Sequence, residues 1–152
     1  MNKHVLAKIR VCLEISKLSN CPRGNVGAVL IDPDTYSILA DGYNGGPRGG
    51  GRLCGGKVCT RSEQGIESGT EIQVGCHHAE MNVLSNAGRA GVTTLGTTMI
   101  CTHRPCLMCA KLMHHSGIHE VIVIGGSYST NEGVDYLESN SITVNTVDVE
   151  AL

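Results

Sequence analysis

The chain of 152 residues contains no tryptophan and no phenylalanine, and four tyrosines make up its whole aromatic fraction. It also lacks an excess of positive charge, because 12 basic and 14 acidic residues give a formal net charge of −2. Proteins that hold a long nucleic-acid strand combine a basic groove with stacking aromatic side chains. The composition therefore argues against a nucleic-acid partner and favours a small ligand, such as a single nucleotide.

Long apolar runs are absent as well. No stretch is long and apolar enough to cross a bilayer, and residues 1–4 lack the hydrophobic region of a secretory signal. We therefore expect a cytoplasmic protein with no membrane partner, folded as a single domain over residues 1–152. The eight cysteines are then expected to be reduced thiols and metal ligands rather than a disulfide framework.

Two short segments, His78–Glu80 and Pro105–Cys109, carry the strongest chemical signal. One imidazole from His78 and two thiolates from Cys106 and Cys109 hold a zinc ion and leave its fourth position open for water. Glu80 is not a ligand in this arrangement and is free to move protons. A CxxC alone could be a redox pair or half of a structural zinc site, and an HxE alone is common. Together they match the signature of zinc-dependent nucleobase deaminases.

The expected secondary structure alternates strands with helices. This alternation predicts an α/β protein, a three-layer α/β/α sandwich around a mixed sheet of about five strands. The expected segments are a helix over 5–18, strands over 26–31 and 36–40, a long glycine-rich loop over 43–75, a helical run over 79–84 that Gly88 and Gly91 break, a strand over 97–101, a helix over 106–113, a strand over 121–124, a weak helix over 131–139 and an edge strand over 142–149.

Both chemical segments lie at predicted helix starts. Positions two apart point to nearly opposite faces inside a helix, so His78 and Glu80 can face one metal only where a helix begins. Cys106 and Cys109 lie three apart, on one face of the first turn of the helix that follows Pro105. Helix N-termini favour thiolates over thiols, which suits metal ligation.

This order of elements resembles the cytidine deaminase superfamily across nearly the whole chain. Three segments, Cys21–Val29, Gly42–Gly49 and His78–Asn82, are similar to those of deoxycytidylate (dCMP) deaminases. The resemblance implies a cytidine deaminase-like fold, a zinc cofactor, and conversion of dCMP and water to dUMP and ammonia, which feeds thymidylate synthesis. Glu80 is then expected to carry protons from the water to N3 of the ring and to the leaving amine.

The resemblance also implies how a monophosphate is held. Asn44, inside the Tyr-Asn-Gly segment, should hold the sugar or the phosphate, while Arg23 and Tyr128 should approach the phosphate. Arg104 lies next to the metal ligands. The alternative for each arginine is a solvated surface charge, which is the more common fate of a single arginine.

Many members of the family are hexamers that dCTP activates and dTTP inhibits. The glycine-rich stretch supports the same expectation here, because backbone amides can approach a triphosphate closely in such a stretch. A bound triphosphate is expected to bring Mg²⁺. The alternative is a flexible loop. The expected effector-binding residues are Gly45, Gly46, Arg48 and Gly49.

Four further cysteines remain in and around the long loop. Some dCMP deaminases carry a second, structural zinc in this region, and four thiolates would close a tetrahedral site and hold the loop in place. His77 could replace one of these ligands, and the irregular spacing weighs against the site. The cysteines are Cys21, Cys54, Cys59 and Cys76.

Three other functions fit parts of the sequence. A tRNA adenosine deaminase conflicts with the acidic balance and the missing aromatics, and a free cytidine deaminase conflicts with the segment Gly42–Gly45. A non-catalytic nucleotide-sensing or zinc-stabilised module conflicts with Glu80, because such a module has no use for a carboxylate beside an open zinc position.

Overall fold

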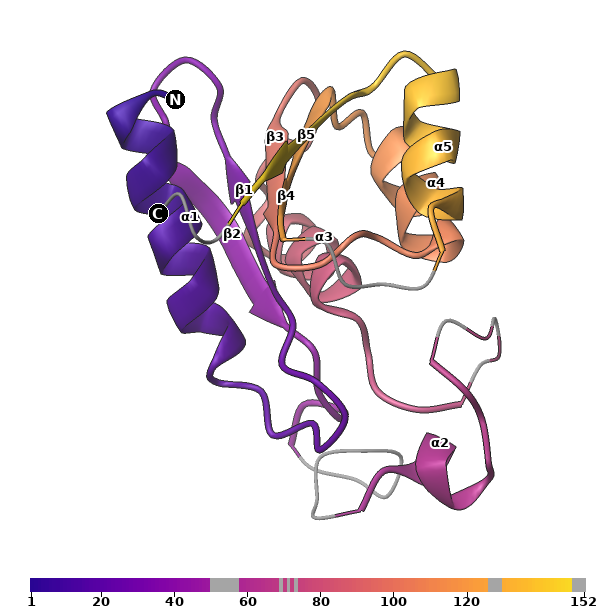
Figure 1. Ribbon diagram of the computed structural model, residues 1–152. Coiled ribbons are helices and arrows are strands. Elements are labelled where there is room, and N and C mark those ends of the chain that lie inside the picture. The colour runs from indigo at the N-terminus through magenta and orange to yellow at the C-terminus, as the bar shows by residue number, and fades with distance from the viewer. Residues whose placement is uncertain (50–57, 69, 71, 73, 126–129, 149–152) are drawn as a thin grey trace.

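The computed structural model describes residues 1–49, 58–68, 70, 72, 74–125 and 130–148 (Figure 1). These residues form five helices and five strands. In chain order they are α1 (Lys3–Ser16), β1 (Gly27–Ile31), β2 (Ile38–Tyr43), α2 (Thr60–Glu63), α3 (Ala79–Ala90), β3 (Thr98–Cys101), α4 (Leu107–His115), β4 (Glu120–Ile124), α5 (Glu132–Ser139) and β5 (Thr143–Val147).

The strands form one mixed sheet in the order β2-β1-β3-β4-β5. The pairs β1/β2 and β1/β3 are antiparallel, whereas β3/β4 and β4/β5 are parallel. The predicted mixed sheet of five strands is thus confirmed, with β5 at one edge. Because β2 and β3 both run antiparallel to β1, the residues that follow them emerge at the same end of the sheet.

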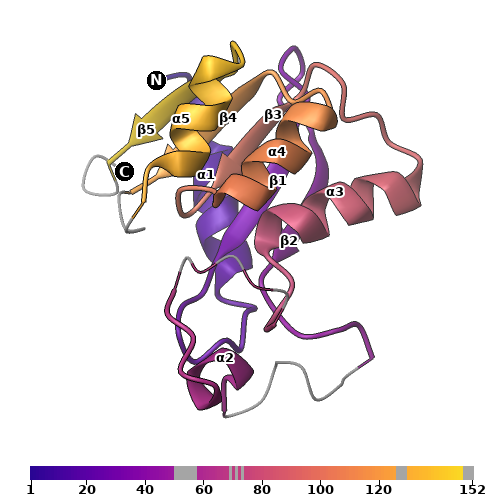
Figure 2. The same ribbon diagram turned by 90° about the vertical axis from the view of Figure 1, so that its right-hand side faces the viewer.

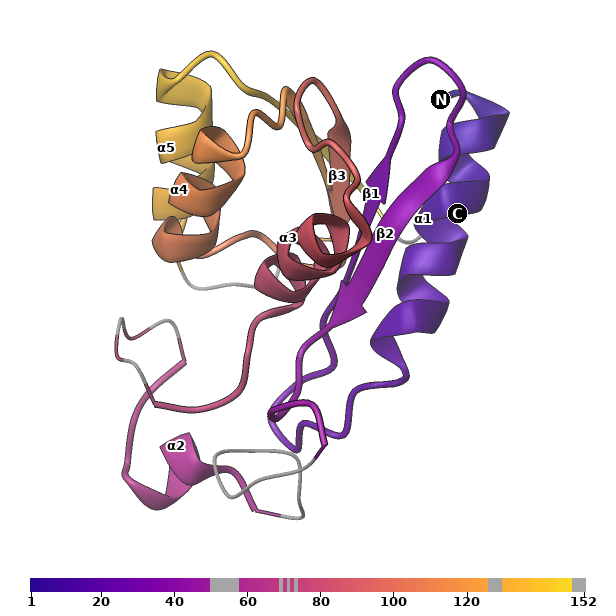
Figure 3. The same cartoon turned by 180° about the vertical axis from the view of Figure 1, so that it is seen from behind.

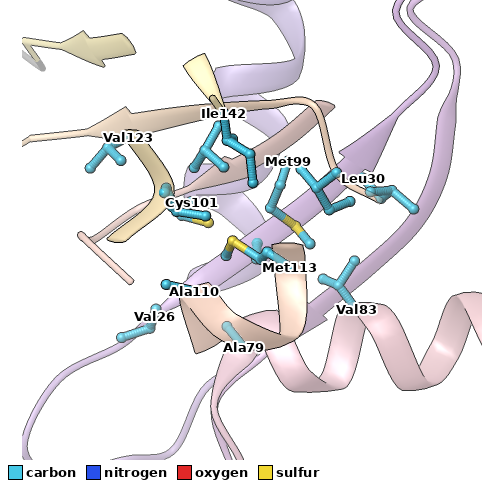
Figure 4. Close-up of a cluster of buried hydrophobic side chains, with 14 of the residues drawn as sticks. Val26, Leu30, Ala79, Val83, Met99, Cys101, Ala110, Met113, Val123 and Ile142 are labelled. Atoms are coloured by element: carbon cyan, nitrogen blue, oxygen red, sulfur yellow. The ribbon is translucent and has the colours of Figure 1, made fainter. Parts of the chain in front are cut away.

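Helices cover both faces of the sheet, which gives the predicted three layers. The α1 helix lies on one side, and α3, α4 and α5 lie on the other (Figures 1 and 3). Buried side chains form a separate cluster on each face. Figure 4 shows the cluster beneath α3 and α4, which includes Val26, Leu30, Ala79, Val83, Met99, Cys101, Ala110, Met113, Val123 and Ile142.

The α3 helix packs closely against the edge strand β2. A Cβ atom added at Gly42 would lie 2.9 Å from both Ala79 O and Val83 N, so only a glycine permits this approach. Two side chains of α3 also donate hydrogen bonds to backbone carbonyl oxygens of β2. Asn82 Nδ2 donates to Tyr43 O and Asn86 Nδ2 donates to Asp41 O, both at 2.8 Å. The edge of the sheet therefore fixes where α3 begins.

The structure changes several predicted boundaries: α1 spans Lys3–Ser16 rather than 5–18, and β2 spans Ile38–Tyr43 rather than 36–40. The α3 helix continues through Gly88 to Ala90, and Gly91, with a left-handed φ of 69°, is its C-cap. An interior glycine costs only about 1 kcal/mol relative to alanine, which the buried Val83 and Ala87 offset. The long loop contains the one-turn helix α2. Cys106 is the N-cap of α4 rather than its first residue.

Figure 2 shows the segment around α2 beyond the end at which α3 begins. In the described part of the chain, no helix combines the length and apolarity needed to cross a membrane.

Candidate metal centre and active site

Three predicted ligands converge in the structure. Donor atoms of His78, Cys106 and Cys109 all lie within 4.8 Å of one another, and they are the only such group of three among the described residues. His78 Nδ1 lies 3.5 Å from Cys106 Sγ and 3.4 Å from Cys109 Sγ. The predicted grouping of one imidazole with two thiols is therefore present.

Two helix starts bring the donors together. His78 is the N-cap of α3 and Cys106 is the N-cap of α4. The Cys106 sulfur accepts a hydrogen bond from the Cys109 amide at 3.5 Å, which holds the two cysteines in one helical turn. A two-way backbone bridge between Gly45 and His77, with N···O distances of 3.1 and 2.8 Å, ties the residue before His78 to the chain leaving β2.

Hydrogen bonds among the three donor side chains shift their pKa values in opposite directions. A hydrogen bond from Cys109 is the main cause that lowers the pKa of Cys106 to about 4. The same bond, together with burial, raises the pKa of Cys109, and the bond to Cys106 raises the pKa of His78. A divalent cation would replace these protons and compensate the same charge, because metal binding requires deprotonated ligands.

This donor set fits zinc. Zinc is bound by thiolate and imidazole in tetrahedral sites, and catalytic sites use three protein ligands. The described residues offer three donors here and no fourth, which leaves one coordination position for water or substrate. His77, the nearest alternative ligand along the chain, has an exposed side chain.

Glu80 lies in the first turn of α3 with only 4% of its surface exposed. Burial is the main cause that raises the pKa of its carboxyl group, against the opposing effects of the positive charge of His78 and of a hydrogen bond with Cys109. The carboxyl group therefore lies close to the three donors and is poised to hold a proton as well as to release one.

Asn44 is buried, with 6% of its surface exposed, and its side chain bonds to the chain that enters β1. Its Oδ1 accepts from Val26 N at 2.8 Å, and its Nδ2 donates to Gly24 O at 2.9 Å. The structure thus gives Asn44 a role in positioning this loop. Its contact with a sugar or phosphate stays a prediction.

The cationic side chains predicted near the phosphate occupy different places. Arg23 is exposed and donates to Ile66 O at 2.8 Å and to Ser68 Oγ at 2.6 Å. Arg104 is half-buried, two residues before Cys106, and donates to Asn131 Oδ1. Tyr128 lies outside the described residues.

The glycine-rich stretch is described as far as Gly49, which adopts a φ of 89°. The Gly45 amide already donates to His77 O, so it is engaged within the chain. Arg48 is exposed and donates to Asn86 Oδ1 at 2.8 Å. Nothing in these contacts tests effector binding at Gly45, Gly46, Arg48 or Gly49.

The second zinc also stays a prediction. Cys54 lies outside the described residues, and Cys21, Cys59 and Cys76 do not by themselves form a group with all donor atoms within 4.8 Å. Cys59 is buried at the start of α2. Burial is the largest single influence on its thiol pKa and acts to raise it. Hydrogen bonds from Ser62, Arg61 and Arg23 together outweigh burial, so the pKa is lowered.

Two residues near the site had no signal in the sequence. Arg61 of α2 donates to the carbonyl oxygens of Val74, Glu67 and Thr70 at 3.4, 3.2 and 2.6 Å, which shapes the segment that leads to His78. Thr102 Oγ1 accepts from the amide that begins β1, that of Gly27, at 2.9 Å. The Arg61 contacts span 6 to 13 positions and the Thr102 contact spans 75 positions, and no local pattern in the sequence marks either residue.

Known proteins share both the sequence and the fold. The chain is 36% identical over 121 residues to deoxycytidylate deaminase of Schizosaccharomyces pombe, a match over 79% of this chain but only 35% of that protein. It is 33% identical over 110 residues to deoxycytidylate deaminase of Mycobacterium phage D29, over 68% of this chain and 80% of the relative. The chain thus spans about a third of the yeast protein's length.

A crystal structure of dCMP deaminase from cyanophage S-TIM5 in complex with dCMP and dUMP superposes with a TM-score of 0.80. The two proteins are 28% identical, and the match covers 97% of this chain and 99% of that one. Residues 3–125 match the family described as the cytidine and deoxycytidylate deaminase zinc-binding region. This match includes all three converging donors and Glu80, so the chain belongs to the cytidine and deoxycytidylate deaminase family.

Proposed function

We propose that this protein catalyses the hydrolytic deamination of dCMP to dUMP and ammonia and so supplies dUMP for thymidylate synthesis. The observation that carries the proposal is the group of His78, Cys106 and Cys109 donors beside the buried Glu80. The choice of dCMP as substrate is supported by the relatives called deoxycytidylate deaminase and by the cyanophage enzyme, which was crystallised with dCMP and dUMP.

Three residues would hold the metal: His78, Cys106 and Cys109. A zinc ion bound there would lower the pKa of a coordinated water toward about 7. The chain's own contribution is the Glu80 carboxylate, which accepts a proton from the attacking water and delivers it to N3 of the cytosine ring. The water oxygen bonds to C4, and Glu80 then takes the remaining proton of that hydroxyl group and passes it to the exocyclic amino group. The C4–N bond breaks, ammonia leaves and the C4 carbonyl of dUMP forms.

The phosphate group of the substrate calls for cationic or hydrogen-bonding partners. Arg104 is proposed for this role because it lies two residues before Cys106, and its guanidinium has further N–H groups besides the one that donates to Asn131. Asn44, Arg23 and Tyr128 complete the proposed set. In the structure the Arg23 guanidinium donates to residues 66 and 68, so phosphate contact requires either its remaining N–H groups or an exchange of partners.

We also propose that the protein is a hexamer under allosteric control. The nucleotide dCTP activates it and dTTP inhibits it, and Mg²⁺ accompanies the bound triphosphate. The proposed effector-binding residues are Gly45, Gly46, Arg48 and Gly49. A structural zinc at Cys21, Cys54, Cys59 and Cys76, or with His77, would hold the neighbouring segment. The support is the glycine-rich composition and the number of cysteines in this part of the chain.

Ammonia release from dCMP, deoxycytidine and dCTP by the zinc-loaded protein tests the proposal. We expect turnover of dCMP with a kcat/KM well above that of the other two substrates, because the phosphate contacts are absent or misplaced in those. Equal turnover of deoxycytidine would indicate a free cytidine deaminase. A protein that binds zinc but releases no ammonia from any of the three would contradict the proposed function.

A further inference from the structure

The first turn of α5 lies directly against the loop that carries a metal ligand. We propose that this turn is a supporting part of the metal centre, in which Gly133 positions Cys106 and Asn131 positions Arg104. The metal part of the inference rests on the proposed ligation by Cys106. The substrate does not enter it.

Gly133 contacts the backbone on the N-terminal side of Cys106. A Cβ atom added there would overlap Pro105 O and would lie 2.9 Å from Pro105 C and 3.0 Å from Cys106 C. Such distances to backbone atoms cannot be relieved by a side-chain rotation, so either α5 or the loop must move. Glycine at this position therefore allows α5 to press on the peptide group that joins Pro105 to Cys106.

Asn131 supplies a second contact to the same loop. The residue is the N-cap of α5, yet its side chain makes no capping bond with its own helix. Its Oδ1 instead accepts a hydrogen bond from Arg104 Nη1. The side chain that would ordinarily stabilise the helix start is thus used to hold the residue next to Pro105.

The rest of α5 fixes the orientation of this turn. Leu137 is fully buried in the cluster beneath the helices. The Tyr136 hydroxyl lies 3.0 Å from His114 Nδ1, near the end of α4. The α5 helix thus contacts the last turn of α4 through Tyr136 and the loop before α4 through Gly133. A shift of α5 therefore moves the start of α4, where Cys106 and Cys109 lie.

The matched family region ends at residue 125, before α5 begins at residue 132. The contacts of Gly133 and Asn131 nevertheless reach the ligand loop. The C-terminal helix therefore acts on the metal site from outside the zinc-binding region. Outer partners of this kind orient metal ligands, and their loss typically weakens metal binding about 10- to 100-fold.

The test compares Gly133→Ala with Gly88→Ala. Both changes add one methyl group within a helix, but a Cβ at Gly88 meets nothing within 4 Å. Zinc affinity is measured by competition with a chromophoric chelator. The phase of the zinc titration that a Cys106→Ser variant loses is the one that belongs to this site. We expect Gly133→Ala to bind zinc at least about tenfold more weakly, with an unchanged far-ultraviolet circular dichroism spectrum, and Gly88→Ala to bind like the parent.

A second pair keeps the test decisive if Gly133→Ala fails to fold. Asn131→Ala removes the acceptor of the Arg104 bond, whereas Asn131→Asp keeps an oxygen in the same place. We expect weaker zinc binding for Asn131→Ala and recovery for Asn131→Asp. Parent-like zinc affinity in both variants would overturn the inference, and if Gly133→Ala does not fold, parent-like zinc affinity in Asn131→Ala alone overturns it. This test measures zinc binding and not activity. A protein that fails to deaminate dCMP would therefore overturn the proposed function but leave the inference about α5 and the metal centre unaffected.

Discussion

At the scale of single residues, the central feature is a buried carboxyl group beside three metal-binding atoms. Glu80 is 4% exposed, and burial is the main cause that raises its pKa. Burying a carboxyl group costs folding free energy unless the group is hydrogen-bonded or paired with a charge. Its place in the first turn of α3, two residues after His78, suits the proposed role, in which Glu80 alternately binds and releases a proton.

Replacing Glu80 by glutamine should remove the proton carrier and keep the shape of the side chain. We expect kcat for dCMP to fall by about 100- to 10,000-fold, because general acid–base catalysis contributes that much. Zinc content, measured by atomic absorption, should stay that of the parent, since the three proposed ligands are intact. Loss of zinc in Glu80→Gln would show that Glu80 is a ligand, and unchanged kcat would show that it carries no proton.

The metal donors were predictable from the sequence, whereas their supporting contacts were not. His78, Cys106 and Cys109 belong to two local patterns whose spacing has a chemical meaning. The Pro105 carbonyl contact of Gly133 joins residues 28 positions apart, and no local pattern marks it. Asn44 illustrates the difference within one motif. The resemblance assigned it to the substrate, while the structure shows its amide bonded to Gly24 and Val26.

At the scale of elements, the site depends on how closely α3 packs on β2. Gly42→Ala should destabilise the protein by about 1–3 kcal/mol, because the new methyl group meets the α3 backbone at 2.9 Å. Gly88→Ala is the matched control and should stabilise by up to about 1 kcal/mol through helix propensity. Urea unfolding of both metal-free variants measures the difference. Equal stability of the two would contradict the close packing of α3.

The turn between β1 and β2 offers a prediction on pH. Asp32 Oδ1 accepts from Thr35 N at 2.7 Å and from Asp34 N at 2.9 Å, and the Thr35 bond is the main cause that lowers the Asp32 pKa. A carboxyl group whose pKa is lower in the folded state stabilises the fold above its unfolded pKa, about 4. That contribution is lost as the pH falls through the lower, folded value.

Asp32→Asn tests this directly, because the amide oxygen can accept the same two bonds without the charge. We expect the variant to melt below the parent at pH 7, with the gap in Tm closing as the pH falls below about 4. Thermal unfolding of the metal-free proteins across this range provides the measurement. A gap in Tm that stays constant down to low pH would show that the charge of Asp32 contributes nothing.

Element types followed from hydrophobic periodicity, but boundaries depended on tertiary packing. Every predicted helix and strand lying within the described residues is present, because apolar spacing reflects which faces are buried. Gly88 did not break α3, since the buried face of that helix continues to Ala87. The one-turn helix α2 had no periodic signal, as four residues are too few to show one.

At the scale of the whole molecule, regulation by nucleotides and assembly are tested together. We expect dCTP with Mg²⁺ to raise the rate of dCMP deamination below saturation and dTTP to lower it. Light scattering should give the mass of a hexamer. The matched variant Arg48→Ala should lose the response to effectors but keep basal activity. If neither triphosphate changes the rate, the proposed role of Gly45–Gly49 is wrong.

The most direct test of the whole account follows the oxygen atom. The zinc-loaded protein is incubated with dCMP in water enriched in ¹⁸O, and the product is examined by mass spectrometry. Hydrolysis at the His78, Cys106 and Cys109 centre predicts dUMP with one ¹⁸O at C4 and an equal amount of ammonia. Absence of dUMP, or dUMP that carries no ¹⁸O, would contradict hydrolytic deamination of dCMP by this protein.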